Sequence, residues 1–342
     1  MFVNKSLFLI NSSCRCLLLT ADYNTSQLKL ISDAQFPIFA IQYSKYMIYL
    51  ILSILSSTLL GFIMTWFEKY KVNPFQAVVV NYFTCVLTGW VFVGEFPIRE
   101  GFQDLNWFPY AAGISVFFIA GFTVVAYTFQ KFGITVTIII SKMSMIISVL
   151  FAIIAYHEII NFSKILGILV AIAAIILTNL PHEHSVFNQK KIKPIFWFLP
   201  ISVILITATI EIVLQFVEQN ILVNGTSGDP AFVSTVFLFA GIIGFLIALP
   251  GLLTGRLTFS WNNIIGGILL GIPNYFSIYF LMKTLGAGWE GSVVFPINNV
   301  AIIALTAIFG GFIIFKEKYT KLNKLGIVLS VVSILLIAYA SL

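Results

Sequence analysis

Two stretches, YHEIINFSKILG at positions 156–167 and FKEKYTKLNKLG at positions 315–326, decide how this chain folds. They align without a gap, so that Glu158 falls on Glu317 and Gly167 falls on Gly326. Each stretch links two long apolar segments at the same point of its half of the chain. The chain is therefore predicted to be built from two repeats.

Ten apolar segments of about twenty residues fill the chain, and each is long enough to cross a bilayer core of about 30 Å as a helix. Their predicted bounds are 47–67, 75–93, 108–129, 134–156, 164–180, 194–217, 232–253, 263–282, 292–315 and 322–341. The composition, 59% hydrophobic and 9% charged with a mean hydropathy of +1.01, is that of a polytopic membrane protein. Because backbone groups in lipid must be hydrogen-bonded within the chain, we expect an all-α fold.

The longest link between segments, residues 181–193, divides them five and five, into predicted repeats at 47–180 and 194–342. Since five is odd, the second repeat must lie upside down relative to the first, with a cavity between the two. In residues 1–46 the apolar runs are too short to span. We expect a disordered extension or a misassigned start there, the alternative being a tail that docks on the membrane surface.

The repeated acid–loop–glycine junctions and the five-plus-five arrangement resemble the EamA-like ten-helix members of the drug/metabolite transporter (DMT) superfamily. The resemblance covers residues 47–342 and is specific for architecture rather than for substrate. It implies a secondary carrier of a small polar or amphipathic metabolite in the cell membrane. The long tail and a lysine inside the fourth segment depart from the family's pattern.

Basic residues are distributed unevenly between the two sides of the predicted bundle. Loops after odd-numbered segments hold Lys69, Lys71, Lys131, Lys190, Lys191, Lys193, Arg256, Lys316, Lys318, Lys321 and Lys324, whereas the others hold Arg99, Lys164 and Lys283. The positive-inside rule then places both termini outside the cell. The resemblance implies the opposite, with both termini in the cytoplasm.

Lys142 is a charged residue inside the fourth segment, about eight residues from its start. A lysine near the bilayer centre costs about 2.5–3.5 kcal/mol on insertion scales, so it should face the protein interior, water or a counter-charge. We expect it to anchor a carboxylate or phosphate of a substrate. The alternative is a structural ion pair that holds two helices together.

Glu211 is the acid inside the sixth segment, and its repeat equivalent in the first segment is Gly61. At 1.5 Å per residue it should lie about 10 Å further along the membrane normal than Lys142. The two are therefore expected to bracket a central cavity, or to pair in one state only. Glu211 could carry a coupling proton, act as a static counter-ion or stabilise a helix end.

The ninth segment contains Pro296, Asn298 and Asn299. A proline inside a helix removes a hydrogen bond, and broken helices near mid-membrane are where transporter sites gather. We therefore predict a helix break at Pro296 and a substrate site at the two asparagines. The alternative is that the asparagines only hydrogen-bond neighbouring helices.

Weaker candidates for lining the same site are polar residues in other segments: Asn81, Tyr127, Gln215, Asn274 and Tyr275. Taken singly, hydrogen bonding between helices or an interfacial aromatic position explains each of them better. Gly267 and Gly271 form a small-xxx-small pattern that permits close helix packing or dimerisation.

Other functions find little support in the sequence. His182 and His184 lie two residues apart without a third strong ligand, so no metal or other cofactor is expected. The alternative to a carrier is an intramembrane enzyme or a flippase of lipid-linked substrates, yet motifs such as Gly-x-Ser-x-Gly and His-Glu-x-x-His are missing. The expected partners are a small-molecule substrate, the lipid bilayer and a candidate coupling proton, with no nucleic acid. The protein is expected to be a monomer or homodimer.

Overall fold

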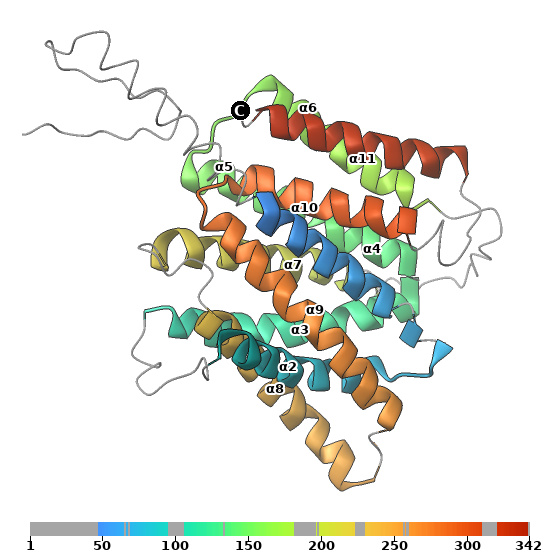
Figure 1. The fold of residues 1–342 in the computed structure, drawn as a ribbon. Helices are drawn as coiled ribbons and strands as arrows, with labels where there is room; N and C mark the ends of the chain where they lie inside the picture. Colours follow the sequence, from blue (N-terminus) through green and yellow to red (C-terminus); the bar gives the residue numbers. More distant parts are fainter. Residues whose placement is uncertain are drawn as a thin grey trace, which may run out of the picture. The chain divides into compact units, whose positions relative to one another are not determined.

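Long helices account for nearly all of the described chain (Figure 1). The structure, a computed structural model, describes residues 47–64, 66–67, 69–94, 106–132, 134–180, 196, 198–222, 230–255, 257, 260–309 and 320–340. The predicted tail, the connecting loop 181–193 and Glu317 lie outside these residues. The described residues belong to one compact unit, Tyr46–Leu342.

The helices follow the predicted segments. After the span Met47–Met64 come α2 (Pro74–Val93), α3 (Phe108–Phe132), α4 (Ile134–Met143), α5 (Met145–Tyr156), α6 (Phe162–Thr178), α7 (Phe198–Phe216), the π-helix η3 (Val217–Ile221), α8 (Pro230–Leu253), α9 (Trp261–Leu285), α10 (Gly291–Leu305) and α11 (Lys321–Ala340). Nine described segments are long and apolar enough to cross a membrane, and the 17-residue α6 is at the lower limit of spanning length. The prediction of an all-α polytopic membrane protein is confirmed.

Local sequence signals explain where α2 begins and ends. The side chain of Asn73 accepts a hydrogen bond from the backbone N–H of Gln76, and Pro74 occupies the first helical position. At the other end Gly94 adopts a φ of 81°, and its N–H bonds to the carbonyl of Trp90. Glycine permits this left-handed conformation, which ends the helix.

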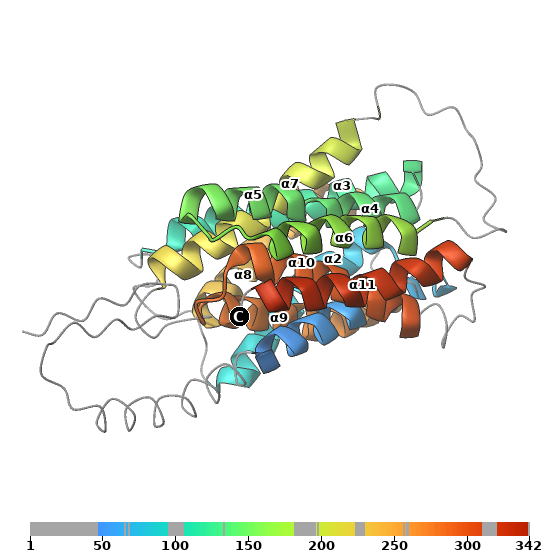
Figure 2. The same ribbon diagram turned by 90° about the horizontal axis from the view of Figure 1, so that it is seen from above.

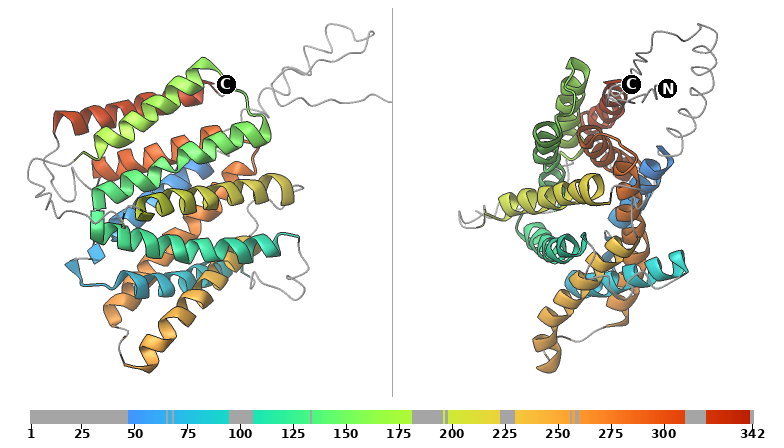
Figure 3. Two further views of the ribbon diagram at one scale, coloured as in Figure 1. Left: turned by 180° about the vertical axis from the view of Figure 1, so that it is seen from behind. Right: turned by 90° about the vertical axis from the view of Figure 1, so that its left-hand side faces the viewer.

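Equivalent helices of the two halves run antiparallel, as an inverted repeat requires. Gly167, near the start of α6, lies against Ile337 near the end of α11, while Gly326, near the start of α11, lies against Thr178 at the end of α6. The two helices pack along each other and lie side by side in Figures 1 and 3. A two-fold axis that exchanges them must therefore cross the helices rather than follow them.

Other helix pairs also correspond when the halves are exchanged. α2 packs along α9, and the equivalent pair, α8 and α3, packs in the same way. In the first pair both predicted small residues serve contact within the chain: a side chain at Gly267 would meet the backbone of Ala77, and one at Gly271 would meet Thr84. Close approach of backbones is a main source of helix association in lipid.

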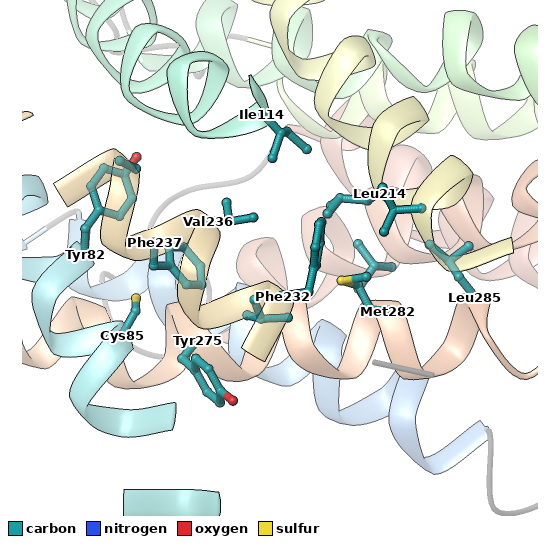
Figure 4. Packing of buried hydrophobic residues seen from close by; sticks show 14 of the residues in the cluster. Tyr82, Cys85, Ile114, Leu214, Phe232, Val236, Phe237, Tyr275, Met282 and Leu285 are labelled. Atoms are coloured by element: carbon teal, nitrogen blue, oxygen red, sulfur yellow. The ribbon is translucent and has the colours of Figure 1, made fainter. Parts of the chain in front are cut away.

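Apolar side chains of α2, α3 and α8 pack in one buried cluster, to which Tyr82, Ile114 and Phe237 belong (Figure 4). Tyr82 of α2 stacks on Phe237 of α8 with ring centroids 5.9 Å apart, and Phe118 of α3 meets Phe237 edge-on at 5.7 Å. Trp107, just before α3, packs edge-on against Phe232 at 5.9 Å. These contacts join the first half of the chain to the second.

The most enclosed helix is α10. In the span Gly291–Phe309, 72% of the residues are buried inside the protein, against 56% for α2, the next highest share among the described spans. α10 contacts α5, α6 and α11 and runs between its neighbours in Figures 1 and 2. Polar residues on α10 therefore face protein rather than lipid.

Candidate functional site

The fourth span has a one-residue irregularity beside Lys142, at Ser144, which the sequence did not predict. α4 ends at Met143 and α5 begins at Met145, with Ser144 forming a turn between them. The hydroxyl of Ser144 donates a 2.7 Å hydrogen bond to the carbonyl of Ser141, which a regular helix would pair with a backbone N–H. Lys142 lies in the last turn of α4.

Lys142 reaches across to α10. Its Nζ donates a 3.0 Å hydrogen bond to Oδ1 of Asn299, a buried residue near the middle of the span Gly291–Phe309. Lys142 belongs to the first half of the chain and Asn299 to the second. The charge inside the fourth span is therefore directed into the bundle, as predicted.

Glu211 on α7 lies at the other end of the same chain of hydrogen bonds. Its Oε1 accepts a 3.1 Å hydrogen bond from Nδ2 of Asn299, and its Oε2 accepts one from the hydroxyl of Ser148 on α5. A single amide thus bridges the ammonium of Lys142 and the carboxylate of Glu211. We call Lys142, Ser148, Glu211 and Asn299 the central network.

The central network unites three of the predicted site residues and adds one that was missed. The expected offset of about 10 Å between Lys142 and Glu211 does not keep them apart, because Asn299 lies between their side chains. Ser148 carries no distinctive sequence signal. Thr123, in another span, bonds to a carbonyl of its own helix, and sequence alone does not separate such a case from Ser148.

Asn298 is buried beside the central network, and its side-chain Oδ1 has no hydrogen-bond partner. The predicted helix break at Pro296 is not present, because α10 continues from Gly291 to Leu305 through the proline. Pro296 lies in the second turn of α10 and removes one backbone donor, so that flanking turns can keep the helix direction. The irregularity near the site lies in the fourth span instead.

The remaining candidates lie apart from the central network. Nδ2 of Asn274 on α9 donates a 3.1 Å hydrogen bond to Asn81 on α2, so this pair joins two helices. Tyr275 is fully buried and packs where a side chain at Gly89 would stand. Tyr127 is 54% exposed on α3. Their positions match the packing and interfacial interpretations rather than a shared cavity lining.

Gln215 belongs to a second polar group, at the start of α10. Both oxygens of Glu158 accept backbone hydrogen bonds there, from Gly291 at 2.8 Å and from Ser292 at 2.9 Å. Nε2 of Gln215, a fully buried residue of α7, donates to Oε1 of Glu158 at 3.3 Å. An acid that caps the first backbone N–H groups of a helix also interacts favourably with the helix dipole.

Lys164 completes this second group. Its side chain is 1% exposed, forms an ion pair with Glu290 and donates a 3.0 Å hydrogen bond to the hydroxyl of Ser292. From the sequence we assigned Lys164 to a loop, because the side chain of a lysine at the end of an apolar segment normally reaches the lipid headgroups. We call Glu158, Lys164, Gln215, Glu290 and Ser292 the α10 clamp.

The central network contains one ammonium and one carboxylate joined by an amide. An ammonium has three donors, and Asn299 accepts one from Lys142. Within the described ranges no three His, Cys, Asp or Glu side chains gather as metal ligands do. The histidines of the sequence His182-Glu-His184 lie outside those ranges.

Comparisons with known proteins agree with this architecture. Residues 44–180 match the model of the EamA-like transporter family, whose members are membrane transporters of the DMT type. The chain is 26% identical over 304 residues to a protein of Haemophilus influenzae (strain ATCC 51907 / DSM 11121 / KW20 / Rd) named only as uncharacterized; the match covers 85% of this chain and 97% of that one.

A solved crystal structure of another protein has a similar fold. It matches with a TM-score of 0.64 and 13% sequence identity, and the match covers 87% of this chain and 98% of the other. At that identity the likeness shows the fold alone. The family resemblance drawn from the repeat junctions agrees with the family match, which covers the first predicted repeat.

Proposed function

Because residues 44–180 match the model of the EamA-like transporter family, we propose that this protein is a secondary carrier that moves a small anionic or zwitterionic metabolite across the cell membrane. It would work by alternating access, with the two inverted halves rocking about a site at mid-membrane. A membrane transporter of the DMT type is what the family match implies. Substrate class and mechanism are our proposal.

One observation carries this proposal: the central network joins the two halves through charged side chains at mid-membrane. Lys142 and Ser148 come from the first half, and Glu211 and Asn299 from the second. Charges placed inside a membrane protein are costly and usually mark a path for substrates or ions. A site made from both halves is also one that relative motion of the halves would change.

The side chains suggest a division of roles. Lys142 would bind the negative group of the substrate, and Glu211 would be its counter-ion or the carrier of a coupling proton. Asn299 would supply hydrogen bonds to both. Asn298 offers a buried acceptor that has no partner in this structure, and an N–H donor on the substrate could satisfy it.

Replacing Lys142 with alanine tests the central role. Lys142→Ala should abolish uptake into proteoliposomes while leaving membrane insertion intact, because the anchor for the negative group is gone. Lys324→Ala, which removes an exposed lysine of α11, is the matched control and should transport as the wild type does. Wild-type uptake by Lys142→Ala would refute the anchor role.

The substrate class can be narrowed before transport is measured. Purified protein is screened for thermal stabilisation by amino acids, carboxylates and phosphorylated metabolites, since a ligand that binds the folded state raises its stability. Counterflow of a stabilising compound then separates a carrier from an enzyme. Saturable exchange supports the carrier, whereas conversion of the compound without movement contradicts it.

A further inference from the structure

The α10 clamp connects the two halves of the chain at one end of the bundle. Glu158 and Lys164 belong to the first half, while Gln215, Glu290 and the start of α10 belong to the second. The clamp contacts are the two backbone hydrogen bonds to Glu158, the amide of Gln215, and the ion pair and hydroxyl bond of Lys164. Any motion that separates the halves at this end must break them.

The ion pair in the clamp is unusual in being buried on one side. Lys164 is 1% exposed and Glu290 is 33% exposed, so the lysine depends on its partners for compensation of its charge. Removing one partner of such a pair leaves an uncompensated buried charge, which is strongly destabilising. The contact between the two halves at this end is therefore stabilised by the ion pair as well as by helix packing.

The other half of the sequence does not repeat the lysine of this ion pair, although it repeats Glu158 as Glu317. By the gapless alignment of residues 156–167 with 315–326, Lys164 corresponds to Asn323. Nδ2 of Asn323 donates hydrogen bonds of 3.0 to 3.2 Å to carbonyls at the end of α6, so it has a different role from Lys164. The two halves have thus diverged from each other at this junction, and the acid–base pair is present in one copy.

The clamp lies on the same helix as the central network. Ser292 and Asn299 are seven residues apart on α10, which corresponds to about 10 Å along the helix axis. Tyr156 and Asn220 add a further link between the halves at the clamp end, with a 2.9 Å hydrogen bond. The clamp therefore closes the end of the bundle that lies two turns from Asn299.

From these contacts we propose that the α10 clamp is a gate, and that its ion pair keeps this end of the protein closed at rest. The proposal rests on the proposed carrier function for its meaning, because only a carrier needs to open this end. When the halves separate here, Glu158 releases the start of α10, and Lys164 releases Glu290. The central network then becomes accessible from this side.

The test uses charge exchange in the full-length protein and needs no ligand. Lys164→Glu and Glu290→Lys each place like charges together, and the double variant restores an opposite pair. Hydrogen exchange of the backbone amides at the start of α10 measures the opening directly. We expect both single variants to exchange at least about tenfold faster than the wild type, and the double variant to recover most of the protection. Lys324→Glu on the exposed face of α11 is the control and should match the wild type.

A second readout decides whether the clamp acts as a gate. A cysteine at Asn298, in a protein whose native cysteines are replaced by serine, is labelled with a membrane-impermeant maleimide from each side of the membrane. We expect the single variants to increase labelling from the clamp side only, and the double variant to reverse the increase. If the single variants show faster hydrogen exchange at the start of α10 but no greater maleimide labelling at position 298, the clamp is not a gate. It would then only stabilise the contact between the two halves.

Failure to fold is distinguished from gating by a milder variant. Glu158→Gln keeps one accepting oxygen and removes only the charge, so it should loosen the clamp without exposing a like-charge pair. Unchanged exchange in this variant, together with no rescue in the double variant, would also refute the proposal. Because neither readout depends on transport, loss of the carrier function and loss of the gate give different results.

Discussion

Asn299 is an amide held between a cation and an anion. Its oxygen accepts from Lys142 and its nitrogen donates to Glu211, so each end of the side chain meets the charge that suits it. Hydrogen bonds to charged groups contribute about 1.5–3 kcal/mol each, more than bonds between neutral groups. Asn81 carries the same side chain but meets the neutral amide of Asn274.

This difference predicts two outcomes for one kind of substitution. Asn299→Leu should abolish uptake and lower the midpoint of thermal unfolding clearly, since two charged groups lose their partner. Asn81→Leu should retain uptake, with a loss of about 0.6 kcal/mol, the average for a hydrogen bond between membrane helices. Uptake and thermal unfolding of the two variants, measured side by side, check this. Equal loss of uptake in both would contradict the assignment of the site.

At the scale of elements, α6 and α11 secure each other's ends. Asn161 is the residue before α6. Its Nδ2 donates a 2.8 Å hydrogen bond to the carbonyl of Ala340 at the end of α11. In return, Asn323 of α11 meets the carbonyls of Leu177, Thr178 and Leu180 at the end of α6. The last carbonyls of a helix have no partner within it, so these amides supply one.

Removing either amide should lower stability without affecting transport. Asn323→Ala leaves buried carbonyls at the end of α6 without a partner and should cost about 1–3 kcal/mol. Asn161→Ala removes the N-cap of α6 and should cost about 1 kcal/mol. Thermal unfolding in detergent at one scan rate ranks the two variants. A larger effect for Asn161→Ala would contradict the contact geometry.

At the scale of the whole molecule, the charge on the two sides of the bundle decides its orientation. Lys164 is buried in the α10 clamp, so the side that follows even-numbered spans has fewer free basic residues than the sequence suggests. The excess of lysine after odd-numbered spans becomes larger as a result. By the positive-inside rule this side should face the cytoplasm.

Single cysteines report that orientation. In a protein without its native cysteines, Tyr70→Cys and Ile160→Cys place exposed thiols after the first and fourth spans. A membrane-impermeant maleimide added to intact cells should label Ile160→Cys and leave Tyr70→Cys unlabelled until the cells are broken. The reverse pattern would place both termini in the cytoplasm and the α10 clamp on the inner face.

The sequence alone was sufficient to predict the helical class and the position of the spans, and it showed the resemblance to EamA-like transporters. These features depend on local composition and on a repeat that can be read along the chain. It also singled out Lys142, Glu211 and Asn299, which the structure brings together, because a polar residue inside an apolar segment stands out wherever the helix lies. The irregularity at Ser144 could not be distinguished from an ordinary serine in a helix, and the proline of α10 suggested a break that packing does not require.

What only the tertiary structure decided is which of these residues meet. Lys142 and Glu211 are 69 positions apart and lie in opposite halves, and Asn299 joins them only because α4, α7 and α10 converge. The burial of Lys164 was likewise decided by the tertiary structure. The sequence places this lysine at the end of a loop, but in the folded protein it pairs with Glu290 and is 1% exposed. Burial along a segment follows from its own residues, whereas pairing between charges depends on how separate helices pack.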